Sequence, residues 1–199
     1  DMAAWIIPKH RFMTEEEVQI VLTDLKRRGK RSVNTKTNDI IFRLSTICGL
    51  RASEIANLTI ENVRLDHGKS PYVRVVDGKG GVSGDVTIWD SSTAVAFTSH
   101  MTQRLQDNGK PTDKFVQKTN GKAFNRQEIN KRFASAIHGL PDNRRKELSV
   151  HCGRHTAATM LHNKGVSLAT VRDFCRHSNI SVTNVYLHGK ELETTETFE

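Results

Sequence analysis

One stretch of the chain, residues 71–90, constrains the fold more than any other. It is PYVRVVDGKGGVSGDVTIWD, in which two runs rich in β-branched residues flank a glycine-rich segment. β-Branched residues favour strands, and glycines give the backbone the freedom that a tight reversal needs. The pattern predicts a β-hairpin with Lys79 at or near its turn. Because the segments on both sides have helical patterns, the hairpin is predicted to be a small sheet inserted into a helical domain.

Three helices are predicted before the hairpin. Residues 14–28 combine a capping box, formed by Thr14 and Glu17, with apolar residues at helical spacing. A second, more apolar helix covers residues 38–49, where a glycine ends it. A short third helix covers residues 51–58.

Five further helices are predicted after the hairpin, over residues 91–109, 125–140, 154–164, 167–175 and 180–187. Ser91 or Ser92 is the expected cap of the first of these, and Asn125 that of the second. Residues 114–117 are predicted to form a short strand, and residues 141–150 a loop.

No internal repeat and no flexible linker divides the chain. We therefore predict one domain of the α+β class over residues 1–199, mainly α-helical with a small antiparallel β-sheet inserted early. Residues 1–12 are expected to be a linker or a remnant, and residues 187–199 a polar tail.

The charge of the chain bears on its partner. Thirty basic residues against 22 acidic ones give a formal charge of +8 and an isoelectric point of about 9.6. Such an excess on a folded domain is typical of a protein with a polyanionic partner, although a basic protein without one has the same composition.

Cysteine usage and hydropathy bear on the compartment. Cys48, Cys152 and Cys175 form no C-x-x-C pair, which disfavours a zinc ribbon or a disulfide framework. Reduced thiols fit a cytoplasmic protein. The opening AAWII is too short for the core of a signal sequence, and no apolar run approaches a membrane span. We expect a cytoplasmic protein with no membrane partner.

The stretch HCGRH at residues 151–155 admits two interpretations. As soft ligands, His151, Cys152 and His155 suggest zinc, with histidines spaced as in H-E-x-x-H. That motif's glutamate is missing, however, and Arg154 would place a positive charge beside the metal. In the second interpretation His151 and Arg154 share a helix face and bind an oxyanion. His155 also fits a packed histidine with a hydrogen-bond partner.

Other residues with chemical potential each have a plainer explanation. Arg51 lies at a helix start, where phosphate is favoured, but it could simply pair with Glu54 on the surface. Lys79 could donate a proton or be a solvated turn lysine. Tyr186 could be a nucleophile if a base took its proton, or an aromatic on a core face. His177, two residues after a cysteine, is weak as a metal ligand.

In chain order these residues resemble the catalytic domain of the tyrosine recombinase (phage integrase) family, over nearly the full chain. CGLRASEIANLT is similar to the block with the family's first catalytic arginine, and DGKGG to its lysine hairpin. HCGRHTAAT is similar to the His-x-x-Arg-His block, and CRHSNISVTNVYLH to the block with the second histidine and the nucleophile. The catalytic residues implied by the resemblance are Arg51, Lys79, His151, Arg154, His177 and Tyr186, and the supporting ones are Glu54 and His155.

The resemblance implies a site-specific recombinase of DNA integration and recombination that needs no metal, ATP or other cofactor. Tyr186 would attack a DNA phosphodiester, giving a 3′-phosphotyrosine bond and a free 5′-hydroxyl, and a second DNA end would reverse the reaction. His151 would accept the tyrosine's proton or hold the phosphate, and Lys79 would protonate the departing oxygen. The groups that would stabilise the charge on the phosphate are Arg51, Arg154 and His177.

The chain departs from the family pattern at two positions. Gly153 stands where the family usually has an apolar residue, and Arg176 stands where it usually has glycine. We expect Gly153 to loosen local packing and Arg176 to add a phosphate contact.

By resemblance, the partner is double-stranded DNA, with self-association into a synaptic tetramer on DNA and a monomer in solution. Further DNA contacts are predicted at Lys26, Arg27, Arg28, Lys30, Arg31, Arg144, Arg145, Lys146 and Arg176. For the basic clusters at residues 26–31 and 143–146, an ordinary solvated surface is an equally good explanation. Family members usually carry an N-terminal core-binding domain, for which there is no room before residue 12. The chain is therefore expected to be the catalytic half of a longer, nucleoid-associated protein.

Three other functions remain open at this point. A relaxing enzyme of the type IB topoisomerase kind shares the chemistry and would act without sequence preference. A DNA-binding protein that has lost cleavage would bind a site and form no covalent adduct. A zinc protein built on residues 151–155 would hold stoichiometric metal.

Overall fold

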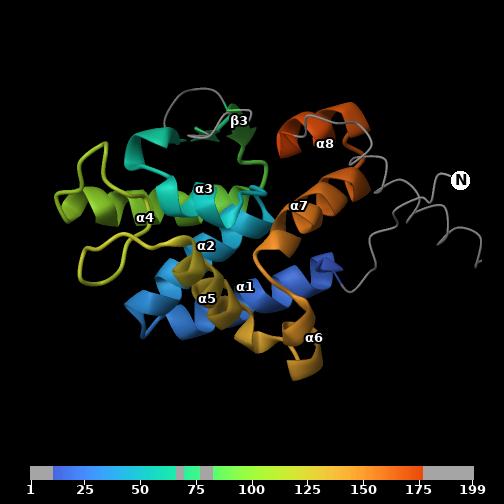
Figure 1. The fold of residues 1–199 in the computed structure, drawn as a ribbon, viewed down its shortest axis with the longest axis horizontal. Coiled ribbons are helices and arrows are strands. Elements are labelled where there is room, and N and C mark those ends of the chain that lie inside the picture. The colour runs from blue at the N-terminus through green and yellow to red at the C-terminus, as the bar shows by residue number, and fades with distance from the viewer. Residues whose placement is uncertain (1–10, 66–69, 77–82, 177–199) are drawn as a thin grey trace, which may run out of the picture.

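The computed structural model describes residues 11–65, 70–76 and 83–176, and Figure 1 shows their arrangement. Lys79, His177, Tyr186 and the predicted helix at 180–187 lie outside these ranges. The α-helices are α1 (Glu15–Gly29), α2 (Val33–Thr46), α3 (Ala52–Asn57), α4 (Ser91–Gln106), α5 (Arg126–Ala136), α6 (Asp142–Glu147), α7 (His151–Asn163) and α8 (Leu168–Cys175). The strands are β1 (Val63–Arg64), β2 (Tyr72–Val75) and β3 (Gly84–Thr87), and two 3₁₀ turns span Ile60–Asn62 and Ile137–Gly139.

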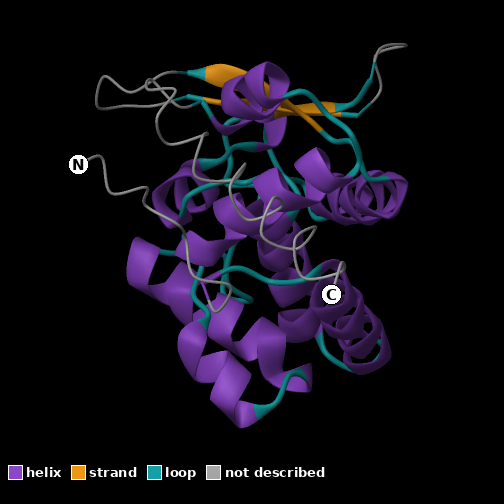
Figure 2. Cartoon of the chain, turned by 90° about the vertical axis from the view of Figure 1, so that its right-hand side faces the viewer, coloured by secondary structure: helices purple, strands orange, loops and turns teal. Residues whose placement is uncertain are grey.

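The predicted fold class is confirmed, with helices dominating and the sheet lying at one end of the molecule (Figure 2). The sheet has the order β1-β2-β3 and is antiparallel throughout. Val73 pairs with Val86, and both are fully buried against the helices. β2 and β3 are the two strands of the predicted hairpin. β1 is a third strand that was not predicted, because its two residues are too few to show a strand pattern in the sequence. None of the helices in the described ranges is long and apolar enough to cross a bilayer.

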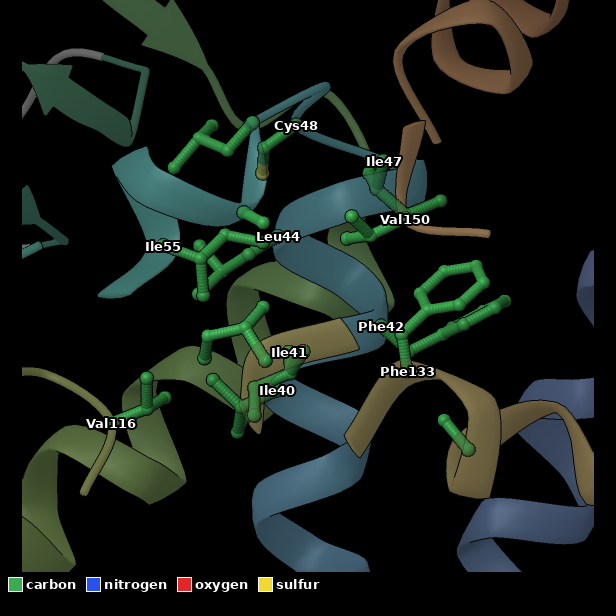
Figure 3. Close-up of a cluster of buried hydrophobic side chains, with 14 of the residues drawn as sticks. Ile40, Ile41, Phe42, Leu44, Ile47, Cys48, Ile55, Val116, Phe133 and Val150 are labelled. Atoms are coloured by element: carbon green, nitrogen blue, oxygen red, sulfur yellow. The ribbon is translucent and has the colours of Figure 1, made fainter. Parts of the chain in front are cut away.

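Helix α2 is the centre of the core (Figure 3). Its apolar residues lie almost all round the helix, and α1, α3, α4, α5 and α7 all pack against it. Phe42 stacks on Phe133 of α5 with ring centroids 5.8 Å apart. Burial of each such ring contributes about 1.5–3 kcal/mol, so α2 fixes where its neighbours lie. One of those neighbours is α7, which carries the HCGRH stretch.

Several helix starts agree with the predicted caps. Thr14 and Glu17 form the capping box of α1, and Asn125 and Glu128 form that of α5. Elsewhere the boundaries differ. α2 begins five residues earlier than predicted, because Ser32 caps it through the Thr35 backbone N–H and its polar first turn gives no apolar signal.

One helix cap and one predicted strand also need correction. The cap of α4 is Asp90, whose carboxylate accepts from the Thr93 N–H at 2.8 Å, rather than Ser91 or Ser92. The short strand predicted at 114–117 is wrong. Lys114 and Gln117 make only isolated bridges outside the sheet, Lys114 to Thr59 and Gln117 to the nearby Ala123.

The predicted loop at 141–150 is also wrong, because it contains helix α6. None of the residues of α6 is buried, so the helix leaves no apolar periodicity in the sequence. Charge pairs hold it instead, namely Arg144 with Glu147 and Arg145 with Asp142. Helix α7 then starts at His151, three residues before the predicted start. The sequence did not indicate this start, because the N-cap residue is Val150, whose side chain makes no cap hydrogen bond.

Candidate active site

A pocket of about 220 Å³ opens at the first turn of α7. Its lining residues are Leu50, Arg51, Val150, His151, Arg154 and His155. Two chain segments about 100 residues apart therefore meet here, the turn that leads into α3 and the start of α7. Since α7 begins at His151, its N-terminal dipole adds positive potential to the pocket. The arrangement suits a bound anion.

Glu54 of α3 organises the arginines around this pocket. Its Oε2 atom accepts from the Arg51 backbone N–H at 2.8 Å, from Arg154 Nη2 at 3.3 Å and from Arg176 Nη2 at 2.7 Å. The Arg51 guanidinium lies 4.0 Å from the other carboxylate oxygen and is 56% exposed. One carboxylate thus serves three guanidiniums and leaves two positive charges in excess. The pairing of Arg51 with Glu54 is real, but it does not neutralise the site.

Arg154 is fixed from two sides. Its Nε donates to the Gly49 carbonyl at 3.0 Å, and its Nη2 donates to Glu54. Gly49 has φ of 66°, a left-handed conformation that glycine adopts without a steric penalty. That conformation turns the chain between α2 and α3 and directs the Gly49 carbonyl toward the arginine. The side chain of Arg154 is only 9% exposed, so its orientation is set before any ligand arrives.

Burial and neighbouring charges shift two ionisable groups here. Burial lowers the pKa of the Arg154 guanidinium to about 10, and Arg176 and Arg51 act in the same direction while Glu54 opposes them. Arg154 therefore stays protonated at neutral pH. Burial also lowers the pKa of His155, with further lowering from the charges on Arg154, Arg11 and His151. A lowered pKa favours neutral His155, whereas His151 is exposed at the pocket.

Gly153 is explained by the crossing of α2 and α7. A methyl group at this position would lie 1.9 Å from Ser45 Oγ and 2.6 Å from the Ser45 carbonyl oxygen. Ser45 Oγ also donates to the Val150 carbonyl at 3.2 Å. The expectation of looser packing is therefore wrong. The missing side chain lets the two helices approach closely, which brings Arg154 to Gly49.

Arg176 also needs correction. It was expected to add a phosphate contact, but its side chain is 5% exposed and paired with Glu54. Its φ of 54° places it in the left-handed region, at the C-cap of α8. This conformation explains why glycine suits the position.

The metal interpretation of HCGRH finds no support in the geometry. Cys152 is buried, and its Sγ accepts from the Ser149 backbone N–H, whereas His151 is exposed. Among residues 11–65, 70–76 and 83–176, no group of three or more His, Cys, Asp and Glu side chains could hold a metal ion.

The predicted DNA contacts divide by exposure. The exposed ones are Lys26, Arg27, Lys30, Arg31 and Lys146. The others make contacts within the fold. Arg28 donates to Asp24 at 2.7 Å and to the Ala136 carbonyl at 3.1 Å. Arg144 pairs with Glu17 at 2.6 Å, and Arg145 pairs with Asp142 and contacts His138. Arg28, Arg144 and Arg145 are thus less exposed than the other five and have partners within the fold.

Of the eight predicted catalytic and supporting residues, the structure brings together Arg51, Glu54, His151, Arg154 and His155. Lys79, His177 and Tyr186 lie outside the described residues. The sequence interpretation missed Gly49 as the partner of Arg154. Only its role as a helix stop was apparent, because nothing in the local pattern shows where its carbonyl points.

Comparisons with known proteins identify the family of the chain. The sequence model of the phage integrase family matches residues 11–193. Tyrosine recombinase XerD of Staphylococcus aureus is 33% identical over 172 residues, which cover 86% of this chain and 56% of that protein. A tyrosine recombinase of Pseudothermotoga lettingae is 28% identical over 167 residues, covering 81% and 53%. The chain thus spans little more than half the length of these relatives.

Solved structures show the same fold. XerA recombinase superposes with a TM-score of 0.75 at 19% identity, covering 94% of this chain and 65% of the other. XerH site-specific recombinase, in a pre-cleavage complex with its difH substrate, superposes with a TM-score of 0.70 at 19% identity, covering 95% and 53%.

Proposed function

The chain belongs to the phage integrase family, and we propose that it is the catalytic domain of a site-specific recombinase that cuts and rejoins DNA through Tyr186. The observation that carries this proposal is the charged pocket, in which Arg51 and Arg154 flank a space at the start of α7. A DNA phosphate fits such a space, because a phosphodiester under attack gains negative charge that fixed cations stabilise.

In the proposed reaction the phenolic oxygen of Tyr186 attacks the phosphorus, and the bond from phosphorus to the 5′ oxygen breaks. The tyrosine's proton passes to His151, and Lys79 protonates the departing 5′ oxygen. The product is a 3′-phosphotyrosine linkage and a free 5′-hydroxyl. Attack by the 5′-hydroxyl of a second DNA end reverses these steps, so no bond energy is lost to water.

Two observations on the described residues support part of this mechanism. Arg154 is oriented by Gly49 and Glu54 before substrate binds, and preorganised charges avoid a reorganisation cost at the transition state. His151 is exposed at the pocket, which is consistent with a contact to a bound phosphate. We assign the remaining roles, at Lys79, His177 and Tyr186, from the family resemblance of their sequence blocks.

The partners proposed are double-stranded DNA and further copies of the chain, which would form a synaptic tetramer on DNA. XerH, which shares the fold, binds its difH substrate, and this supports DNA as the partner. We propose that residues 1–199 act as one catalytic domain within a longer recombinase, at the nucleoid in the cytoplasm where DNA is found. Lys26, Arg27, Lys30, Arg31 and Lys146 are the proposed phosphate contacts outside the pocket, since they are exposed.

The nucleophile can be tested directly. Nicked duplexes cut from the DNA that flanks the gene are incubated with the protein, and denaturant-resistant adducts are measured. We expect wild type to form an adduct and Tyr186→Phe to form none. Tyr72→Phe is the matched control, because Tyr72 is the only other tyrosine of the chain, and it should form as much adduct as wild type.

Equal adduct from Tyr186→Phe and wild type would refute the assigned nucleophile. Tight binding by the wild type without adduct on any duplex would instead indicate a binding protein that has lost cleavage. Relaxation of supercoiled DNA without sequence preference would indicate a topoisomerase-like activity.

A further inference from the structure

Arg176 adopts a conformation that an arginine rarely takes. It caps α8 with φ of 54° and ψ of 40°, in the left-handed region, and it directly precedes His177. Such a conformation costs free energy for a residue with a Cβ, and it persists where surrounding contacts hold it. The contacts of its side chain are therefore informative.

Two elements hold the Arg176 side chain. On α3, Glu54 Oε2 accepts from its Nη2 at 2.7 Å, and the two side chains are 5% and 9% exposed. On β3, the aliphatic stem packs against Gly84, where an added methyl group would lie only 3.3 Å from Arg176 Cδ. In Figure 1, α8 and β3 lie next to each other above α3 and α7. Arg176 thus joins α8, α3 and β3.

The contact with Arg176 is the shortest that Glu54 makes with a charged partner. Arg154 Nη2 lies 3.3 Å from the same oxygen, and Arg51 Nη1 lies 4.0 Å from the other one. Arg51 and Arg154 line the pocket, whereas Glu54 and Arg176 do not. Without Arg176 the carboxylate would be free to close on Arg154 and Arg51 and neutralise them. With Arg176 in place, the Glu54 carboxylate is held outside the pocket lining that Arg51 and Arg154 form.

Arg176 also has an incomplete set of hydrogen bonds. Its Nη1 atom is buried and has no hydrogen-bond partner among the described residues. A buried charged donor left in this way costs free energy, so general stability is a poor explanation for the residue. A role in the site that Glu54 organises explains it better.

We propose that Arg176 is a positioning residue for strand cleavage, which draws Glu54 away from the pocket and so keeps Arg51 and Arg154 available to the phosphate. It also ties the chain just before His177 to α3 and β3. This inference rests on the proposed recombinase function. It does not place Arg176 in contact with DNA.

The test separates cleavage from binding. Arg176→Asn removes the guanidinium but keeps a residue that tolerates the left-handed conformation. On the nicked duplex that gives the most adduct with wild type, we expect its single-turnover cleavage rate to fall about 10- to 100-fold. Its Kd for the same duplex should change less than about twofold, because other phosphate contacts supply most of the affinity. Arg176→Lys, which keeps a cation beside Glu54, should recover part of the rate.

Two further variants act as controls. Arg172 lies on the same helix and pairs with Asp173 at 2.9 Å, and Arg172→Asn should change neither rate nor Kd. The methyl group of Gly84→Ala would crowd the aliphatic part of the Arg176 side chain, so this single substitution should slow cleavage. In the Arg176→Asn background the same change should have little further effect, because the long stem is gone.

The outcomes are distinct. Wild-type cleavage by Arg176→Asn would overturn the inference, and so would equal losses of rate and affinity, which indicate a phosphate contact. If Arg176→Asn fails to fold, wild-type rates from both Arg176→Lys and Gly84→Ala would overturn it instead. Absence of adduct from the wild type itself would refute the proposed function, and this inference would fall with it.

Discussion

Glu17 and Glu54 each pair with at least one arginine that lies far away in the sequence, but the two clusters differ in net charge. Glu17 accepts from Arg144 Nε at 2.6 Å and Nη2 at 3.1 Å, and Arg144 also pairs with Glu147. Two carboxylates thus surround one guanidinium. Around Glu54 the ratio is reversed, because one carboxylate serves three guanidiniums.

The difference shows how the same residue types serve different ends. The Glu17 cluster joins α1 to α6, and Arg144 also donates to the Phe12 carbonyl, so this cluster stabilises the fold. The Glu54 cluster is more deeply buried and keeps excess positive charge beside a pocket. Excess buried charge destabilises a protein unless a ligand compensates it, which is why such clusters mark functional sites.

The largest effect is expected from Glu54→Gln. Removing this carboxylate leaves the buried Arg154 and Arg176 without a counter-charge, at a cost of about 3 kcal/mol in the free energy of unfolding. Glu17→Gln, in a more exposed cluster, should cost about 1 kcal/mol. Urea unfolding measures both.

Unfolding in the presence of sulfate extends the comparison of Glu54→Gln with Glu17→Gln. It should return more stability to Glu54→Gln than to Glu17→Gln, because an anion can bind the unpaired guanidiniums. If the two variants lost the same stability and regained the same amount with sulfate, the distinction between the two clusters would be wrong.

A smaller effect is expected from Gly153→Ala, beside Arg154. The added methyl group forces α7 away from Ser45 of α2, and overpacking of this kind costs about 1–3 kcal/mol. Gly29→Ala on α1 is the matched control, because its methyl group would meet only Lys36 Cγ, at 3.7 Å. Thermal unfolding should therefore show a loss for Gly153→Ala alone. A neutral Gly153→Ala would contradict the close crossing of α2 and α7.

The smallest effect is expected from pH acting on the Glu17 cluster. Burial by itself would raise the pKa of Glu17, but hydrogen bonds from Arg144 and from the Thr14 backbone outweigh it, so its pKa lies below the ordinary 4.5. A lowered carboxyl pKa adds stability above the unfolded value, and this stability is lost as pH falls through the folded value.

Between pH 5 and pH 3, wild type should lose more stability than Glu17→Gln, by less than about 1 kcal/mol. Urea unfolding at the two pH values measures the difference. Parallel losses in the two proteins would show that Glu17 does not contribute in this way.

The sequence predicted most of the fold because its signals are local. Capping boxes at Thr14 and Asn125 and the paired β-branched runs each act over a few residues, and they gave correct elements. It failed where the determinant was a distant contact or a surface charge pair. Helix α6 has no buried residue, and its anchor, Arg144, finds its partner on α1.

For the site, the sequence by itself determined the residue types and their order along the chain, since the chemistry of phosphate transfer restricts which side chains can serve. Only the tertiary structure decided how they are used. It turned Arg176 from an expected phosphate contact into a partner of Glu54, and it made Gly153 the point where α2 and α7 touch. Both results depend on where separate helices cross. That geometry is set by packing of the whole core, which no short stretch of sequence encodes.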